Sequence, residues 1–159
     1  MDEGDLAELC MMHNDPRVMA TLGGIRSDDE TRKYLADNAD HWSRYGFGVW
    51  SLRDRGGRFA GRAGIRHLDL DGIDEVELLY SFMPEFWGAG MATEIAEALL
   101  DIGFREHGLQ NIVAYTLTDH RASRRVMEKV GFQLESERDI KGYPCALYRL
   151  QAAAFRKPI

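Results

Sequence analysis

The segment from Pro84 to Glu94 has the residue types and spacing best suited to a chemical task. It reads Pro-Glu-Phe-Trp-Gly-Ala-Gly-Met-Ala-Thr-Glu, a glycine-rich turn between a strand-like run and a helical pattern. The first amides of a helix lack partners within it and point outward at the positive end of the helix dipole. Gly88 and Gly90 permit the close approach of a ligand. The turn therefore favours binding of a pyrophosphate, although a turn that needs glycine only for its shape has the same composition.

A second segment, from Asp119 to Phe132, completes a resemblance to the GNAT superfamily of N-acetyltransferases. The turn at Gly90 is similar to the second half of the superfamily's motif A, with Trp87 where glutamine or arginine is commonest. The second segment resembles the Asn-x-x-Ser-x-x-hydrophobic-x-Glu-Lys-x-Gly-Phe signature of the RimJ/RimL-like branch, the group related to ribosomal-protein N-terminal acetyltransferases. The two motifs stand in the family's order, with a strand–helix–strand arrangement between them.

The resemblance implies acetyl-CoA as the cosubstrate. Strands at 76–82 and 112–117 would run parallel and splay apart near Tyr80–Phe82, with the pantetheine arm in the opening. A backbone N–H near Ser81 or Phe82 would stabilise the thioester oxyanion. The residues expected to bind the cosubstrate are Tyr80, Ser81, Phe82, Trp87, Gly88, Ala89, Gly90, Met91, Ala92, Thr93, His120 and Ser123.

Three side chains are candidates for moving protons. Glu77 precedes the glycine-rich turn and is the candidate general base, with Glu75 as an alternative; a solvated position on the polar face of a strand is the competing interpretation of Glu77. The resemblance assigns Ser123 to protonation of the leaving thiolate, whereas a first-turn serine often bonds only to its own helix. Tyr143 is the third candidate, as a proton donor or as a wall of the acceptor pocket.

The sequence departs from the family in two places. His120 stands where the family usually has an asparagine that contacts pantetheine; it is also interpretable as a helix cap or a titrating group. Relatives begin with a β-strand, whereas this chain opens with a helix, so that strand either lies upstream or is dispensable. We predict a single domain over residues 1–159 with this first strand missing.

Periodicity and turn residues predict the elements that would position these groups. A capping box at Ser27–Glu30 begins a helix that should end at Gly46, and an earlier helix should cover residues 5–12. Strands are expected at 47–53, 58–68, 76–82 and 112–117, with helices at 90–106 and 120–130, the latter capped by Asp119 and buried through Ala122, Val126 and Val130. A hairpin turning at 141–144 should close the chain. The predicted fold is mixed α/β: a twisted, mostly antiparallel sheet with one parallel splayed pair, flanked by helices.

Composition limits the classes of partner. The chain has 20 Lys+Arg against 26 Asp+Glu, a formal charge of −6, which argues against a nucleic-acid binder. No apolar run is long enough to span a membrane, and Cys10 and Cys145 are too far apart to form a framework, so we expect a cytoplasmic protein. The five histidines never pair at helical spacing, and no metal is expected. Arg121, Arg124 and Arg125 could meet the 3′-phosphate of CoA or form a solvated helix face.

We therefore predict transfer of an acetyl group to a primary amine by direct attack in a ternary complex. The acceptor is a protein N-terminus or a small molecule, framed by the loop at 23–26 and the hairpin near Tyr143, and the enzyme is a monomer or homodimer. A non-catalytic acyl-CoA-binding module is the alternative. A nucleotide-phosphate enzyme is the weaker third hypothesis, because the lysine of a P-loop is missing.

Overall fold

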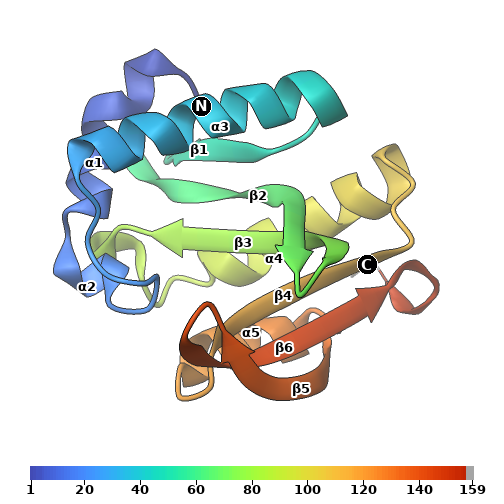
Figure 1. Ribbon diagram of the computed structural model, residues 1–159. Coiled ribbons are helices and arrows are strands. Elements are labelled where there is room, and N and C mark those ends of the chain that lie inside the picture. The colour runs from blue at the N-terminus through green and yellow to red at the C-terminus, as the bar shows by residue number, and fades with distance from the viewer. Residues whose placement is uncertain (157–159) are drawn as a thin grey trace. The chain divides into compact units, whose positions relative to one another are not determined.

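The computed structural model describes residues 1–156 as a six-stranded sheet with helices (Figure 1). The elements in chain order are α1 (Leu6–His13), α2 (Pro16–Met19), α3 (Asp28–Tyr45), β1 (Val49–Arg53), β2 (Phe59–Leu70), β3 (Ile73–Phe82), α4 (Met91–Asp101), β4 (Asn111–Leu117), α5 (Arg121–Lys129), β5 (Gln133–Ile140) and β6 (Tyr143–Gln151). The strand order is β1-β2-β3-β4-β6-β5. Neighbours are antiparallel except β3 and β4, which run parallel with Glu77 opposite Val113. The predicted mixed α/β fold with one parallel pair is confirmed.

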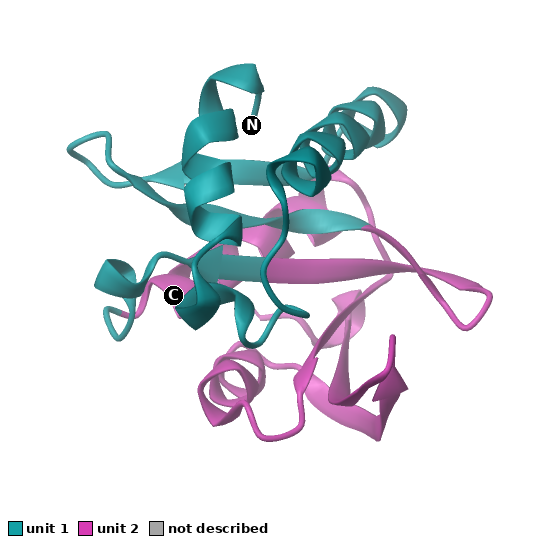
Figure 2. Cartoon of the chain, turned by 60° about the vertical axis from the view of Figure 1, so that its left-hand side comes forward, with its two compact units in different colours: residues 1–66, 80–89 teal, residues 67–79, 90–159 magenta. Residues whose placement is uncertain are grey.

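The chain forms two compact units, coloured separately in Figure 2. Unit 1 comprises residues 1–66 and 80–89, and unit 2 comprises residues 67–79 and the chain from residue 90 onward. Both β2 and β3 contribute residues to each unit. A single domain over the whole chain stays a prediction.

In unit 1, α3 begins and ends where the sequence indicates. The Ser27 hydroxyl accepts a hydrogen bond from the Glu30 amide, and the Glu30 carboxylate accepts one from the Ser27 amide, so the capping box is complete. Gly46 ends the helix in the left-handed conformation at φ 73°. The core of this unit is a cluster of apolar side chains from α1, α2, α3 and β2: Leu9, Met12, Val18, Met19, Leu35 and Phe59.

In unit 2, the core lies under the β2, β4, β5 and β6 strands: Leu68, Leu70, Val113, Ile140, Cys145 and Leu147. The closing hairpin turns at Lys141 and Gly142, both with positive φ. Tyr143 and Pro144, which were expected in that turn, belong to β6 instead. The reason is that a two-residue turn needs only two positions with positive φ.

Helix α5 differs from its prediction in its cap and in its buried face. Its N-cap is His120, without a side-chain hydrogen bond, rather than Asp119. Ser123 and Met127 are its buried residues, whereas Ala122 is exposed and Val126 half-buried. The predicted apolar stripe was therefore wrong by one position, because Ser123 and Met127, four residues apart on one helix face, are the side chains that are buried.

Two further observations complete the fold. Helix α4 gives way to a π-helical turn at Ile102–Glu106, inside the span predicted as one continuous helix. None of the helices within residues 1–156 combines the length and the apolar character needed to cross a membrane.

Candidate active site

The N-terminus of α4 presents amides that are free to bind a ligand. Gly90 is the N-cap, with a left-handed φ of 76°, and its carbonyl accepts the first helical hydrogen bond from the Glu94 amide at 3.2 Å. The amides of Met91, Ala92 and Thr93 precede that bond and donate to no acceptor among residues 1–156. Three successive unbonded N–H groups at the positive end of an eleven-residue helix suit an oxyanion such as a phosphate.

The glycines before α4 leave open space beside the backbone. Gly88 and Gly90 both have φ 76°, and a Cβ built on either would meet no heavy atom within 4 Å. A side chain at either position would be strained by the backbone conformation and would project into the space that a ligand of the turn would occupy. The geometry therefore fits a pyrophosphate held against this turn.

Trp87 forms hydrogen bonds through both its amide and its side chain. Its amide donates to the Pro84 carbonyl at 3.1 Å, so the free amides begin after Trp87 and not at it. The indole ring is 54% exposed, and its Nε1–H donates to the Phe82 carbonyl at 2.9 Å. Trp87 thus ties the glycine-rich turn to the end of β3.

Gly61, which the sequence did not single out, holds the end of β3 close to β2 within unit 1. A Cβ at Gly61 would overlap the Ser81 carbonyl oxygen and lie 2.8 Å from the Phe82 Cα. The Met83 amide donates to the Ala60 carbonyl at 2.8 Å beside it. The sequence could have indicated this role, since a glycine inside a strand often marks the close approach of another backbone. Gly61 therefore positions the backbone of Ser81 and Phe82, where the thioester oxygen is expected.

The two glutamates of β3 have different surroundings. Glu77 is 4% exposed, so a solvated position on the strand is excluded. Glu75 forms a two-pronged ion pair with Arg149, with distances of 2.6 and 3.0 Å. Arg149 also bonds Glu135 and Asn111. Because the Glu75 carboxylate is held by the Arg149 guanidinium, it has a structural role, and Glu77 stays the candidate base.

Ser123 and His120 lie at the start of α5. Ser123 is one of the buried residues of that helix. His120 is half-buried, and burial lowers the pKa of its imidazole, against which the neighbouring Asp119 acts. A neutral imidazole at neutral pH keeps one donor and one acceptor, as contact with a pantetheine amide requires.

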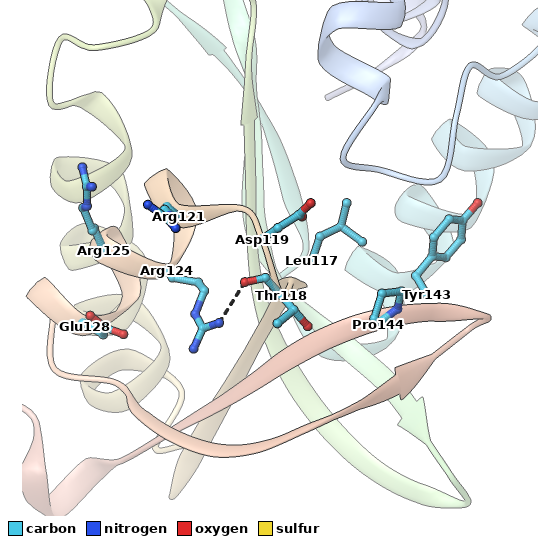
Figure 3. A pocket seen from close by; sticks show the side chains of 9 residues that line it. All are labelled: Leu117, Thr118, Asp119, Arg121, Arg124, Arg125, Glu128, Tyr143 and Pro144. Atoms are coloured by element: carbon cyan, nitrogen blue, oxygen red, sulfur yellow. Dashed lines mark hydrogen bonds between the residues drawn. The ribbon is translucent and has the colours of Figure 1, made fainter.

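An open pocket of about 800 Å³ lies in unit 2 between β4, α5 and β6 (Figure 3). Figure 3 shows Tyr143 across the pocket from the arginines of α5. The residues lining it are Leu117, Thr118, Asp119, Arg121, Arg124, Arg125, Glu128, Tyr143 and Pro144.

The three arginines of this pocket are not equivalent. Arg124 donates to the Thr118 carbonyl at 2.8 Å and to the Tyr148 hydroxyl at 2.9 Å, and it pairs with Glu137. It therefore has a structural task, whereas Arg121 and Arg125 are exposed.

Tyr143 and the segment after β4 line the same pocket, but Glu77 and Ser123 are not among its lining residues. The other predicted site residues are divided between the units: 80–82 and 87–89 belong to unit 1, and Glu77, 90–93, His120 and Ser123 belong to unit 2. Their joint action stays a prediction. No group of three or more His, Cys, Asp or Glu side chains suited to a metal ion occurs within the described residues.

Comparison with known proteins identifies the family. A model of the acetyltransferase (GNAT) domain matches residues 1–133. The uncharacterized protein YkkB of Bacillus subtilis is 33% identical over 150 residues, which cover 93% of this chain and 87% of YkkB.

Solved structures share the fold at low identity. The spermidine N-acetyltransferase of Vibrio cholerae, in complex with CoA and spermine, has a TM-score of 0.79 at 17% identity, covering 97% of this chain and 94% of its own. The ribosomal-protein-S5-alanine acetyltransferase of Vibrio fischeri has a TM-score of 0.80 at 14% identity, covering 98% and 92%. With its matching domain model, its relative and its sheet topology, the chain belongs to the acetyltransferase (GNAT) domain family and is an acyltransferase.

Proposed function

We propose that the protein transfers an acetyl group from acetyl-CoA to a primary amine by direct attack within a ternary complex. The observation that carries this proposal is the set of unbonded amides at Met91–Thr93, following two glycines beside open space. These amides would hold the pyrophosphate of the cosubstrate. The presence of CoA in the spermidine N-acetyltransferase structure supports the same assignment.

Each predicted group has one chemical role. The amine nitrogen attacks the thioester carbonyl carbon, and a backbone N–H at Ser81 or Phe82 stabilises the resulting oxyanion. Glu77 accepts the proton that the amine loses, directly or through a water. The C–S bond then breaks, and Ser123 or Tyr143 gives a proton to the thiolate and recovers it from solvent.

The acceptor's own pKa decides how much the base must do. A peptide α-amine has a pKa of about 7.7–8.0 and is partly neutral near pH 7, whereas a lysine-type amine, at about 10.4, is almost fully protonated. A lysine-type amine therefore needs a base in the site, and the buried Glu77 carboxylate would supply one. A peptide α-amine needs less help, and the same carboxylate could accept its proton too.

We further propose that the chain belongs to the RimJ/RimL-like branch. Support comes from Ser123, the Glu128-Lys129 pair and Gly131-Phe132 in the second motif, and from the fold shared with the S5-alanine acetyltransferase. A cytoplasmic location is part of the proposal and is supported by two free cysteines, Cys10 and Cys145. A monomer or a homodimer is equally compatible with it.

The test combines calorimetry with a thiol-release assay. We expect CoA to bind with measurable heat, and acetyl-CoA to release thiol only when an amine acceptor is present. Binding of CoA without thiol release across a panel of protein N-termini, amino acids, polyamines and aminoglycosides would favour the non-catalytic module. No heat from CoA on folded protein would contradict the proposal itself.

A further inference from the structure

Guanidinium groups gather around one tyrosine ring in unit 1. The Tyr34 ring on α3 has the Arg62 guanidinium carbon 4.6 Å from its centroid and that of Arg26 at 5.4 Å. Arg66 approaches the same ring at 5.9 Å. Arg62 and Arg66 share a face of β2 because side chains alternate along a strand. We call Arg26, Tyr34 and Arg62 the arginine cluster.

Arg62 is buried, and no carboxylate among residues 1–156 pairs with it. It is 3% exposed; its Nη1 donates to the Tyr34 hydroxyl at 2.6 Å, while its Nε lies buried with no hydrogen-bond partner. Within residues 1–156, neither Arg62 nor Arg26 forms an ion pair with a carboxylate. Glu30 acts on Arg26 only at longer range, because its carboxylate caps α3. A buried guanidinium with no anion is costly, so the site is suited to an anion from outside the chain.

His13 borders the arginine cluster without neutralising it. Its ring meets Tyr34 edge-on at 5.3 Å, and its Nδ1 shares a 2.8 Å hydrogen bond with the Thr31 hydroxyl. Its Nε2 is buried without a partner. Because the imidazole is neutral, the charge of the cluster is that of its arginines.

Both arginines are close in the chain to segments expected at the site. Arg62 follows Gly61, which packs against Ser81 and Phe82 within the same unit. Arg26 is in the loop expected to frame the acceptor, and its amide donates to the His13 carbonyl at 2.9 Å. An anion bound by Arg26 and Arg62 would therefore belong to the acceptor's side of the reaction.

We propose that Arg26, Arg62 and Tyr34 bind a carboxylate of the acetyl acceptor, so that the acceptor is a small amine that also carries a carboxylate, such as an amino acid. This inference rests on the proposed function and narrows its substrate class. Guanidinium forks match the two oxygens of a carboxylate, and the phenol adds a hydroxyl. A polyamine, which carries only positive charge, would be repelled by the same groups.

Matched acceptors test the proposal. Thiol release is measured for amino acids, for the corresponding amino-acid amides and for spermidine, each with saturating acetyl-CoA. We expect kcat/KM to be roughly tenfold to a hundredfold higher for the acid than for its amide, because a charge-assisted contact is lost. Equal use of acid and amide, or a preference for spermidine, would overturn the proposal.

Variants assign the effect to the cluster. Arg26→Gln keeps the backbone bond to His13 and should bring the acid and the amide within about twofold of each other, leaving KM for acetyl-CoA unchanged. Arg44→Gln removes an exposed arginine of α3 and should change neither. If Arg26→Gln retains the full preference for the acid, the cluster is not the binding site.

A binding experiment separates this inference from the proposed function. Malonate titrated into the protein without acetyl-CoA should give a heat of binding that Arg26→Gln abolishes and Arg44→Gln retains. If no amine supports thiol release but this heat is present, the acetyl-transfer proposal fails while the anion site stands. If amines are acetylated but malonate gives no heat and acids show no advantage, only the anion site fails.

Discussion

Two glutamates lie two residues apart on β3, and the chain treats them differently. Glu75 is fixed by Arg149, a residue that also holds Glu135. These contacts raise the pKa of the Arg149 guanidinium, Glu75 being the larger cause, and keep the ion pair charged. Glu77 is buried beside the parallel β3–β4 contact. We expect Glu75 to have a structural role because it is ion-paired. We expect Glu77 to transfer the proton because it is buried beside the parallel strands.

Glu77→Gln is the matching test at the residue scale. Glutamine preserves the shape of the side chain but cannot accept the proton, so we expect kcat to fall roughly 10²- to 10⁴-fold while the protein still shows a cooperative unfolding transition. Steady-state thiol release and thermal unfolding measure the two quantities. Glu75→Gln should do the reverse, keeping kcat within a few-fold while lowering stability, because it leaves Arg149 with fewer partners. A Glu77→Gln enzyme with wild-type kcat would remove Glu77 from the mechanism.

At the scale of elements, His13 forms a buried polar contact between α1 and α3 through the Thr31 hydroxyl. Burial, followed by the charges of Arg62 and Arg26, lowers the pKa of His13 from 6.5 to about 3. Below about pH 6.5, His13 therefore binds a proton in the unfolded chain but stays neutral in the folded chain. The contribution of neutral His13 to stability is complete above pH 6.5 and is lost as the pH falls towards 3.

Urea unfolding as a function of pH checks this. Between pH 6.5 and 4.5 the free energy of unfolding should fall with a slope from His13 of up to about 1.4 kcal/mol per pH unit. His13→Asn, which retains an amide near the Thr31 hydroxyl, should be less stable at pH 7 but show a shallower slope. An unaltered slope in His13→Asn would mean that His13 does not titrate on unfolding.

The elements were predictable where a local rule determines them. Ser27, Glu30 and Gly46 fixed both ends of α3, and the glycine-rich turn fixed the start of α4. The buried face of α5 was not predicted, because the local pattern favoured the more apolar face through Ala122 and Val126 over the adjacent face through Ser123 and Met127. Burial of Arg62 was not predictable either, because an arginine in a strand is usually exposed, whereas here its guanidinium lies against the Tyr34 ring of α3. Chain-wide patterns thus gave the fold class, while the polar contacts within each unit needed coordinates.

At the scale of the whole molecule, the net charge is negative but one local site is positive. The chain carries a formal charge of −6, yet the arginine cluster is a local site of positive charge in unit 1. Many acidic side chains are engaged in exposed pairs, such as Asp37 with Lys33 and Asp40 with Arg44, which contribute little to stability. Net charge therefore gives no information on the local charge of the acceptor site.

Binding of CoA should stabilise the whole fold through the turn before α4. A ligand that binds only the folded chain adds about 2.7 kcal/mol to the free energy of unfolding at one hundred times its Kd. Gly90→Val should abolish that gain, because the new side chain occupies space that is open in the protein and needed by the pyrophosphate. Its backbone strain at φ 76° would itself cost about 1–2 kcal/mol.

Gly57→Val separates strain from ligand binding. Gly57 also has a positive φ, 85°, and open space around its missing side chain, but it lies in the turn between β1 and β2. Both variants should therefore lose comparable stability without CoA, and only Gly57→Val should regain the ligand-dependent increment, as measured by denaturant unfolding with and without CoA. Because the comparison holds the backbone strain constant, a Gly90→Val protein that CoA still stabilises in full would place the pyrophosphate somewhere other than the amides of Met91–Thr93.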